Sequence, residues 1–70
     1  MQRRFKFVRD YKCEFGTLEA GNTIDIVNGT IYYNDGLVEP WWAKYLEDLI
    51  RKEMEKPYYL KEVVIPYNKV

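Results

Sequence analysis

The fold is decided by residues 23–33, which read TIDIVNGTIYY. Ile24 and Ile26 alternate with polar residues, and this is the period of a strand that buries one face. The Asn28-Gly29 dipeptide follows, and it suits the two positive φ angles of a type I′ turn. The pattern therefore predicts a β-hairpin whose second arm, Thr30–Tyr33, runs antiparallel to the first.

A strand and a loop are predicted upstream of this hairpin. Phe5 and Phe7 occupy alternate positions within residues 4–9, which predicts a strand with one buried face. The alternation continues to residue 15. The glycines at both ends of residues 16–21 then indicate a loop, with Leu18 as its one apolar anchor.

A second turn and a helix are predicted downstream. Asn34-Asp35-Gly36 repeats the turn signal, so residues 37–38 should form a short third arm. Pro40 suits the first turn of a helix, which should end at about Lys56 because Pro57 follows. The apolar stripe of this helix should comprise Trp42, Tyr45, Leu46, Leu49, Ile50 and Met54.

The expected fold class is α+β. A β-branched run within Glu62–Ile65 predicts a last strand, closed by Pro66. A chain of 70 residues is too short for two hydrophobic cores, so residues 1–70 should form a single domain. We expect a small antiparallel sheet of four to five strands, or a partial barrel, with one helix inserted before the last strand.

The barrel alternative comes from a resemblance. Residues 16–26 and the two turns after them resemble small SH3-like and KOW-like barrels, in which a strand, a G-x-x-x-x-G loop and tight hairpins curl into one sheet. The resemblance implies an SH3-like partial barrel. Small size, aromatic density and short turns are also similar to bacteriophage accessory proteins, and this implies a location in the host cytoplasm.

The composition argues against an enzyme. The chain has no His and no Ser, so relays of the Ser-His-Asp and Cys-His types are ruled out. The Gly16 to Gly21 spacing fits a phosphate-binding loop, but Asn22 stands where the motif needs its Lys. We expect no catalytic residue, no cofactor and no metal site.

Acidic and amide residues near the turns do not change this expectation. Asp25, Asn34, Asp35 and Glu39 lack the spacing of a calcium loop, so they should be turn formers and solvated charges. Cys13 is the only cysteine, and it should be a buried or half-buried thiol in a reducing compartment such as the cytoplasm. No apolar run reaches membrane length, so no membrane partner is expected.

Aromatic residues are the feature that predicts a function. Three Phe, two Trp and seven Tyr are more aromatic area than so short a chain needs for a core. The sequence favours a non-enzymatic binding module, acting stoichiometrically on another protein or associating with itself as a homo-oligomer. The residues expected to contact the partner are Trp41, Tyr45, Tyr32, Tyr33, Tyr58 and Tyr59.

Two other functions stay open. Eleven basic and eleven acidic residues balance, but the basic ones gather near the start of the chain. A nucleic acid or nucleotide could therefore be bound, with a tyrosine stacking on a base. The residues that would contact phosphate are Arg3, Arg4, Lys6 and Arg9. A structural component of a virion would share the surface features of a protein-binding module.

Overall fold

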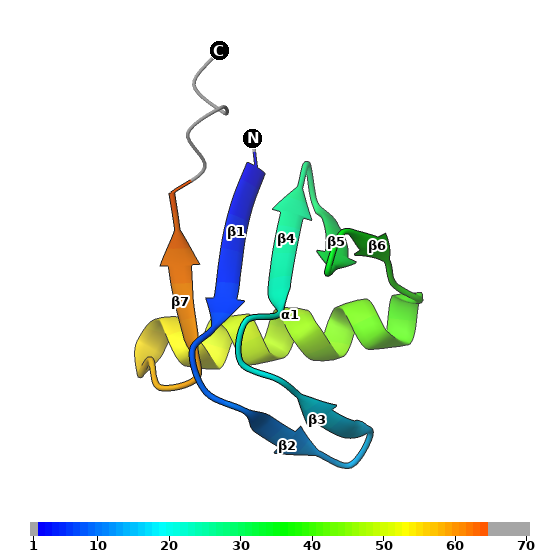
Figure 1. The fold of residues 1–70 in the computed structure, drawn as a ribbon. Helices are drawn as coiled ribbons and strands as arrows, with labels where there is room; N and C mark the ends of the chain where they lie inside the picture. Colours follow the sequence, from blue (N-terminus) through cyan, green and yellow to red (C-terminus); the bar gives the residue numbers. More distant parts are fainter. Residues whose placement is uncertain (1, 65–70) are drawn as a thin grey trace.

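Seven strands and one helix make up residues 2–64, the part of the chain that the structure, a computed structural model, describes (Figure 1). They are β1 (Gln2–Phe7), β2 (Tyr11–Cys13), β3 (Gly16–Leu18), β4 (Thr23–Val27), β5 (Thr30–Tyr33), β6 (Gly36–Leu37), α1 (Pro40–Glu55) and β7 (Leu60–Val63). The expected α+β class, with one helix before the last strand, is confirmed. Pro66 and the end of the predicted last strand lie outside the described residues.

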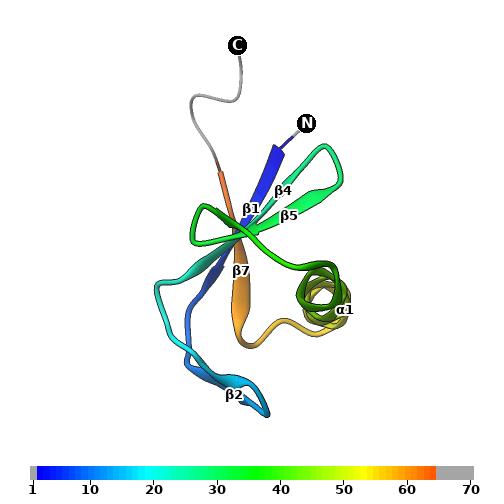
Figure 2. The same cartoon turned by 90° about the vertical axis from the view of Figure 1, so that its right-hand side faces the viewer.

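Five strands form one antiparallel sheet in the order β6-β5-β4-β1-β7. The helix lies across one face of this sheet, as the view along its axis shows (Figure 2). The short strand β6 and the strand β7 are the two edges, so the sheet does not close into a barrel. Of the two predicted architectures, the open antiparallel sheet with a helix on its face is the one observed.

The central hairpin has the predicted turn. Val27 pairs with Thr30, and the two residues between them, Asn28 and Gly29, have φ angles of 51° and 86°. Two consecutive positive φ angles define a type I′ turn, whose twist matches that of the flanking strands. The Asn28-Gly29 prediction is therefore confirmed.

The segment around Gly16 differs from its prediction. Instead of starting a loop, Gly16 begins β3, which pairs with β2 through Cys13↔Gly16 and Tyr11↔Leu18. Glu14 and Phe15 form the two-residue turn between β2 and β3. Gly16 follows the turn with a φ of 125°, a value that glycine adopts without strain. This small ribbon projects beyond the sheet (Figure 1). Leu18 is buried, so its predicted role as an apolar anchor is confirmed.

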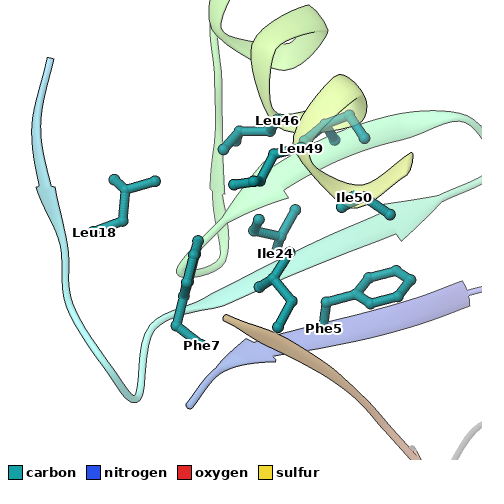
Figure 3. Close-up of a cluster of buried hydrophobic side chains, with 9 residues drawn as sticks. Phe5, Phe7, Leu18, Ile24, Leu46, Leu49 and Ile50 are labelled. Carbon is teal, nitrogen blue, oxygen red and sulfur yellow. The ribbon is translucent and has the colours of Figure 1, made fainter. Parts of the chain in front are cut away.

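The core lies between the helix and the sheet (Figure 3). Leu46, Leu49 and Ile50 supply the helix side, as the apolar stripe predicted. The other buried side chains are Phe5, Phe7, Leu18, Ile24, Ile31 and Leu60. Leu46 on the helix and Ile24 on β4 are both fully buried, so the middle of the helix packs most tightly against the sheet.

The predicted stripe is wrong at Met54, which is 58% exposed. At about 100° per residue, position 53 lies roughly 20° from Leu46 around the helix axis, whereas position 54 lies roughly 80° away. Glu53, and not Met54, therefore continues the stripe toward the end of the helix. A charged residue at this position needs polar partners, and the chain that returns to the sheet supplies them.

One carboxylate oxygen organises the connection from α1 to β7. Glu53 Oε1 accepts the backbone N–H groups of Tyr58, Tyr59 and Leu60 at 2.8, 2.7 and 3.0 Å. Desolvation by burial raises the pKa of Glu53, but the three backbone hydrogen bonds outweigh it, so the pKa lies below its ordinary value. The connection thereby holds Tyr58 and Tyr59 in a fixed place beside the sheet.

Candidate functional site

Four aromatic rings pack against one another where the β2–β3 turn approaches the start of α1. They belong to Phe15, Trp41, Trp42 and Tyr45, and we call them the aromatic surface. The Phe15 ring lies 5.2 Å from Trp41, 5.3 Å from Trp42 and 5.3 Å from Tyr45, centroid to centroid. Trp42 and Tyr45 stack at 5.3 Å with 11° between their planes. Each ring therefore fixes the orientation of its neighbours.

Local structure explains how the helix brings its three rings together. Pro40 occupies the first helical turn, so Trp41 and Trp42 follow at the start of α1. They point about 100° apart around the helix axis, which turns Trp42 toward the core and leaves Trp41 at the rim. Tyr45 follows Trp42 by three residues, the spacing at which helical side chains meet.

Phe15 reaches the same place from the ribbon. It occupies the second position of the two-residue turn between β2 and β3. Its ring packs across the helical rings, and 52% of the residue stays exposed. Trp41 is 56% exposed, while Trp42 and Tyr45 are half-buried against the core. The aromatic surface thus has an exposed half and an anchored half.

Polar contacts hold the edges of the aromatic surface. Trp41 Nε1 donates to Glu39 Oε1 at 2.7 Å, so the exposed indole is held at its polar end. The Tyr45 hydroxyl lies 3.4 Å from the Tyr11 hydroxyl. Burial, followed by the contacts with Tyr11 and Cys13, raises the pKa of Tyr45, so its hydroxyl stays protonated at neutral pH.

A second group of rings continues from Tyr45. Tyr11 meets Tyr59 edge to face at 4.8 Å, and Tyr59 meets Tyr58 in the same way at 4.8 Å. Arg9 covers Tyr58, with its guanidinium carbon 4.4 Å from the ring centroid and its Nε donating to the Tyr58 carbonyl at 3.2 Å. Contacts between aromatic side chains therefore extend from the start of α1, through the Tyr45 and Tyr11 hydroxyls, to the α1–β7 connection. At this second end the guanidinium of Arg9 already covers the exposed Tyr58 ring.

The predicted partner-contacting residues are distributed unequally. Trp41 and Tyr45 belong to the aromatic surface, and Tyr33 borders it with its ring 6.5 Å from Trp42. Tyr33 is held by Asn22, whose Nδ2 donates to its hydroxyl at 2.7 Å, and burial raises its pKa. Tyr58 and Tyr59 belong to the second group. Tyr32 pairs with Asp25 on the opposite face of the sheet and is separate from all of these.

The prediction missed Phe15, the residue that joins the ribbon to the helix. Its signal was the alternation of Tyr11, Cys13 and Phe15, which puts all three on one side of an extended segment. The two residues that precede it on this side are half-buried, and Cys13 Sγ donates to the Gly16 carbonyl at 3.3 Å. The half-buried thiol that the sequence predicted is confirmed.

The four residues predicted to contact phosphate do not share one surface. Arg3 binds Glu62 with both Nε and Nη2 at 2.8 Å, while Arg4 binds Asp25 on the other side of the same strand. Lys6 is exposed on the side of Arg4, and Arg9 covers Tyr58. Both arginines of β1 are thus already paired with carboxylates.

Asp25 corrects another expectation, since it is neither a turn former nor a solvated charge. It lies inside β4 and is 4% exposed, although its face of the sheet has no covering helix. Arg4 and Gln2 cover it, and Gln2 Nε2 donates to its Oδ2 at 3.4 Å. Its charge is neutralised by an arginine from the neighbouring strand.

Within residues 2–64, no group of three or more Cys, Asp or Glu residues is arranged to hold a metal ion. The single helix of this part of the chain is too short and too polar to cross a membrane. No protein-family model, curated protein or solved structure matches this chain. The resemblance to SH3-like barrels and to phage accessory proteins therefore stays a prediction.

Proposed function

We propose that this protein is a small non-enzymatic binding module that acts stoichiometrically by docking the aromatic surface on a partner protein. The observation that carries the proposal is the exposure of Phe15 and Trp41, each more than half exposed although large and apolar. Tryptophan and other aromatic residues are enriched at the centres of protein interfaces, where they dominate the binding free energy. The proposal includes a cytoplasmic location, which suits a chain with a single free thiol.

The arrangement of the rings supports this function energetically. Binding costs free energy when side chains lose rotamer freedom, by about 0.5–1.5 kcal/mol for each one immobilised. Phe15 and Trp41 are already restrained, because their rings pack at 5.2 Å and Glu39 accepts the indole N–H. A partner that covers them would gain apolar burial without paying most of this entropy.

A surface variant with a matched control tests the proposal. Phe15→Ser with Trp41→Ser removes both exposed rings, whereas Leu37→Ser removes a side chain that is 72% exposed on the other face of the sheet. Purified wild-type protein should recover a partner from its source cells, and calorimetry should then measure the affinity for that partner. If the partner is a second copy of the protein, sedimentation experiments should show self-association. The double variant should lose this binding by 100-fold or more, and the Leu37 variant should retain it. Equal binding by all three proteins would overturn the proposal.

The nucleic-acid alternative gives a different result. Fluorescence titration with single-stranded oligonucleotides and cyclic dinucleotides would show an affinity that falls steeply with salt. Phosphates meet little free positive charge near β1, because the guanidinium groups of Arg3 and Arg4 bind carboxylates at 2.7–2.8 Å. Oligonucleotide binding that Lys6→Ala weakens, and that the double ring variant leaves intact, would favour this alternative over protein docking.

A further inference from the structure

Arg3 lies in a small site within the protein that consists of one aromatic ring and one carboxylate. The Arg3 guanidinium carbon lies 5.2 Å from the Phe5 ring centroid, and the same guanidinium donates two 2.8 Å hydrogen bonds to Glu62. Phe5 and Glu62 are direct cross-strand partners, so their side chains lie side by side. One aromatic ring and one carboxylate together hold the arginine. The guanidinium lies over the ring, and the carboxylate accepts its N–H groups.

Trp41 and Glu39 present the same two groups at the start of α1. The carboxylate is held beside the indole by the 2.7 Å hydrogen bond from Nε1 to Oε1. A carboxylate has about four lone-pair positions, so this single bond leaves acceptor capacity for another donor. Among residues 2–64, no Lys or Arg forms an ion pair with Glu39 or lies over the Trp41 ring. Here the ring and the carboxylate are present without a guanidinium.

Acidic residues outnumber basic ones in the part of the chain that forms the aromatic surface. Residues 13–50, which supply all four rings, carry seven acidic side chains and one basic one. Of the seven, Asp25 and Asp35 are already paired with Arg4 on the opposite face of the sheet. Asp48 is already paired with Arg51. Glu14 adjoins Phe15 in the ribbon turn. Burial raises the pKa of Tyr33, the Asn22 hydrogen bond opposes this rise, and the negative charge of Glu19 adds to it. The start of a helix adds only about half a positive elementary charge, which the full charge of Glu39 exceeds.

From this juxtaposition we infer that Trp41 and Glu39 bind an arginine side chain presented by the partner protein. The inference rests on the proposed function and specifies its partner as a basic protein segment. The guanidinium would lie on the exposed indole face and donate to the Glu39 carboxylate, as Arg3 does at Phe5 and Glu62. Lysine fits less well, because its ammonium is strongly hydrated and cannot form a planar two-pronged contact.

Nuclear magnetic resonance titration tests the inference without the natural partner. Trp41 and Trp42 are the only tryptophans, so the protein has two indole N–H signals, which Trp41→Phe assigns. The probes are three capped tripeptides, Gly-Xaa-Gly, in which Xaa is arginine, lysine or neutral citrulline. The arginine peptide should shift the Trp41 signal saturably and bind roughly 3-fold or more tightly than the lysine peptide, as cation–π and fork contacts require. Citrulline should cause no saturable shift.

Variants at the carboxylate complete the test. Glu39→Gln keeps an acceptor for the indole but removes the charge, and it should weaken the arginine peptide by roughly 3-fold or more. Glu55→Gln, at the other end of the same helix, should leave the affinity unchanged. The spectra also report whether each variant is folded. No saturable Trp41 shift, or equal shifts with all three peptides, would overturn the inference.

Failure of this inference is distinguishable from failure of the proposed function. If Phe15→Ser with Trp41→Ser abolishes partner binding while Glu39→Gln leaves it unchanged, the aromatic surface docks a partner that presents no arginine there. The proposed function then stands and the arginine inference is wrong. If Glu39→Gln and the double ring variant both weaken the partner, and the arginine peptide competes with it, both statements hold.

Discussion

Arg4 and Asp25 form a two-pronged ion pair across strands β1 and β4, with Nε to Oδ1 and Nη2 to Oδ2 each at 2.7 Å. The pair lies on the face of the sheet that the helix does not cover, yet Asp25 is buried. Arg4 Nη2 also lies 3.5 Å from Asp35 Oδ1, so the guanidinium meets two carboxylates. The Arg4–Asp25 ion pair thus covers the centre of the sheet face that the helix leaves uncovered.

We predict that Arg4→Ala destabilises the protein by about 1.5–3 kcal/mol, because Asp25 loses two charged hydrogen bonds while the truncated side chain lets water reach its carboxylate. Urea unfolding measures this change. Lys6→Ala is the control, since Lys6 lies two residues further along the same strand face and is exposed; its effect should stay within about 0.5 kcal/mol. The Arg4→Leu and Asp25→Leu double variant should recover much of the loss, because apolar replacement of a buried pair is often neutral. Equal effects of Arg4→Ala and Lys6→Ala would contradict this account.

The hairpin turn gives the second prediction. Gly29 has a φ of 86°, a region that a β-branched residue enters only with strain. Gly29→Val should therefore cost on the order of 1–3 kcal/mol of unfolding free energy. No heavy atom outside the chain neighbours lies within 4 Å of a Cβ placed at this position, so the loss would come from backbone strain and not from a clash. Gly29→Asn should cost clearly less, because asparagine tolerates the left-handed region. Thermal unfolding of the two variants compares them directly.

The two tryptophans should respond differently to truncation. Trp42 packs on the core and stacks on Tyr45, so Trp42→Ala should cost on the order of 3 kcal/mol through a cavity. That is a large fraction of the stability of a domain of this size, which is typically about 5 kcal/mol. Trp41→Ala should cost at most about 1 kcal/mol, because it loses exposed ring contacts only. Circular dichroism and chemical unfolding would show the difference, and the reverse order would mean that the helix is rotated from the position described.

Glu53 should make stability depend on pH. Its pKa is lowered in the folded protein relative to its ordinary value of 4.5. The stabilisation it supplies is therefore complete above about pH 4.5–5 and is lost as pH falls through its lower folded-state pKa. At pH 7, Glu53→Gln should cost about 1–2 kcal/mol, because three backbone donors lose a charged acceptor.

The same variant should show a shallower loss of stability on acidification, so that its unfolding free energy converges with that of the wild type at low pH. Glu55→Gln is the control, since Glu55 is an exposed helical residue two positions further on. Unfolding free energies measured from pH 7 to pH 2 give both curves. Parallel curves for the wild type and Glu53→Gln would contradict the assigned role of Glu53. Glu62, whose pKa Arg3 lowers, is unchanged in both proteins and adds the same dependence to each.

The elements that the sequence predicted correctly depend on neighbouring residues. The Asn28-Gly29 turn adopts its two positive φ angles because those residues permit them. The helix begins at Pro40 and ends at Glu55, before Pro57, because proline suits a first turn and blocks a continuation. The buried positions of Leu46, Leu49 and Ile50 follow from helical periodicity alone. Each of these signals is local, so the residues of one short segment are enough to predict its structure.

Tertiary structure decided the features that give the candidate site its chemistry. Phe15 joins the aromatic surface only because the ribbon folds toward α1, and no local pattern relates it to Trp41. Helical geometry turns Glu53 inward and Met54 outward, but only the returning chain supplies the backbone N–H groups that satisfy a carboxylate at this position. Asp25 became a buried charge through the register of β1 against β4, which places Arg4 directly opposite. The Phe15–Trp41 and Arg4–Asp25 contacts join residues far apart in the chain. Their geometry depends on how helix and strands pack rather than on the residue types beside them.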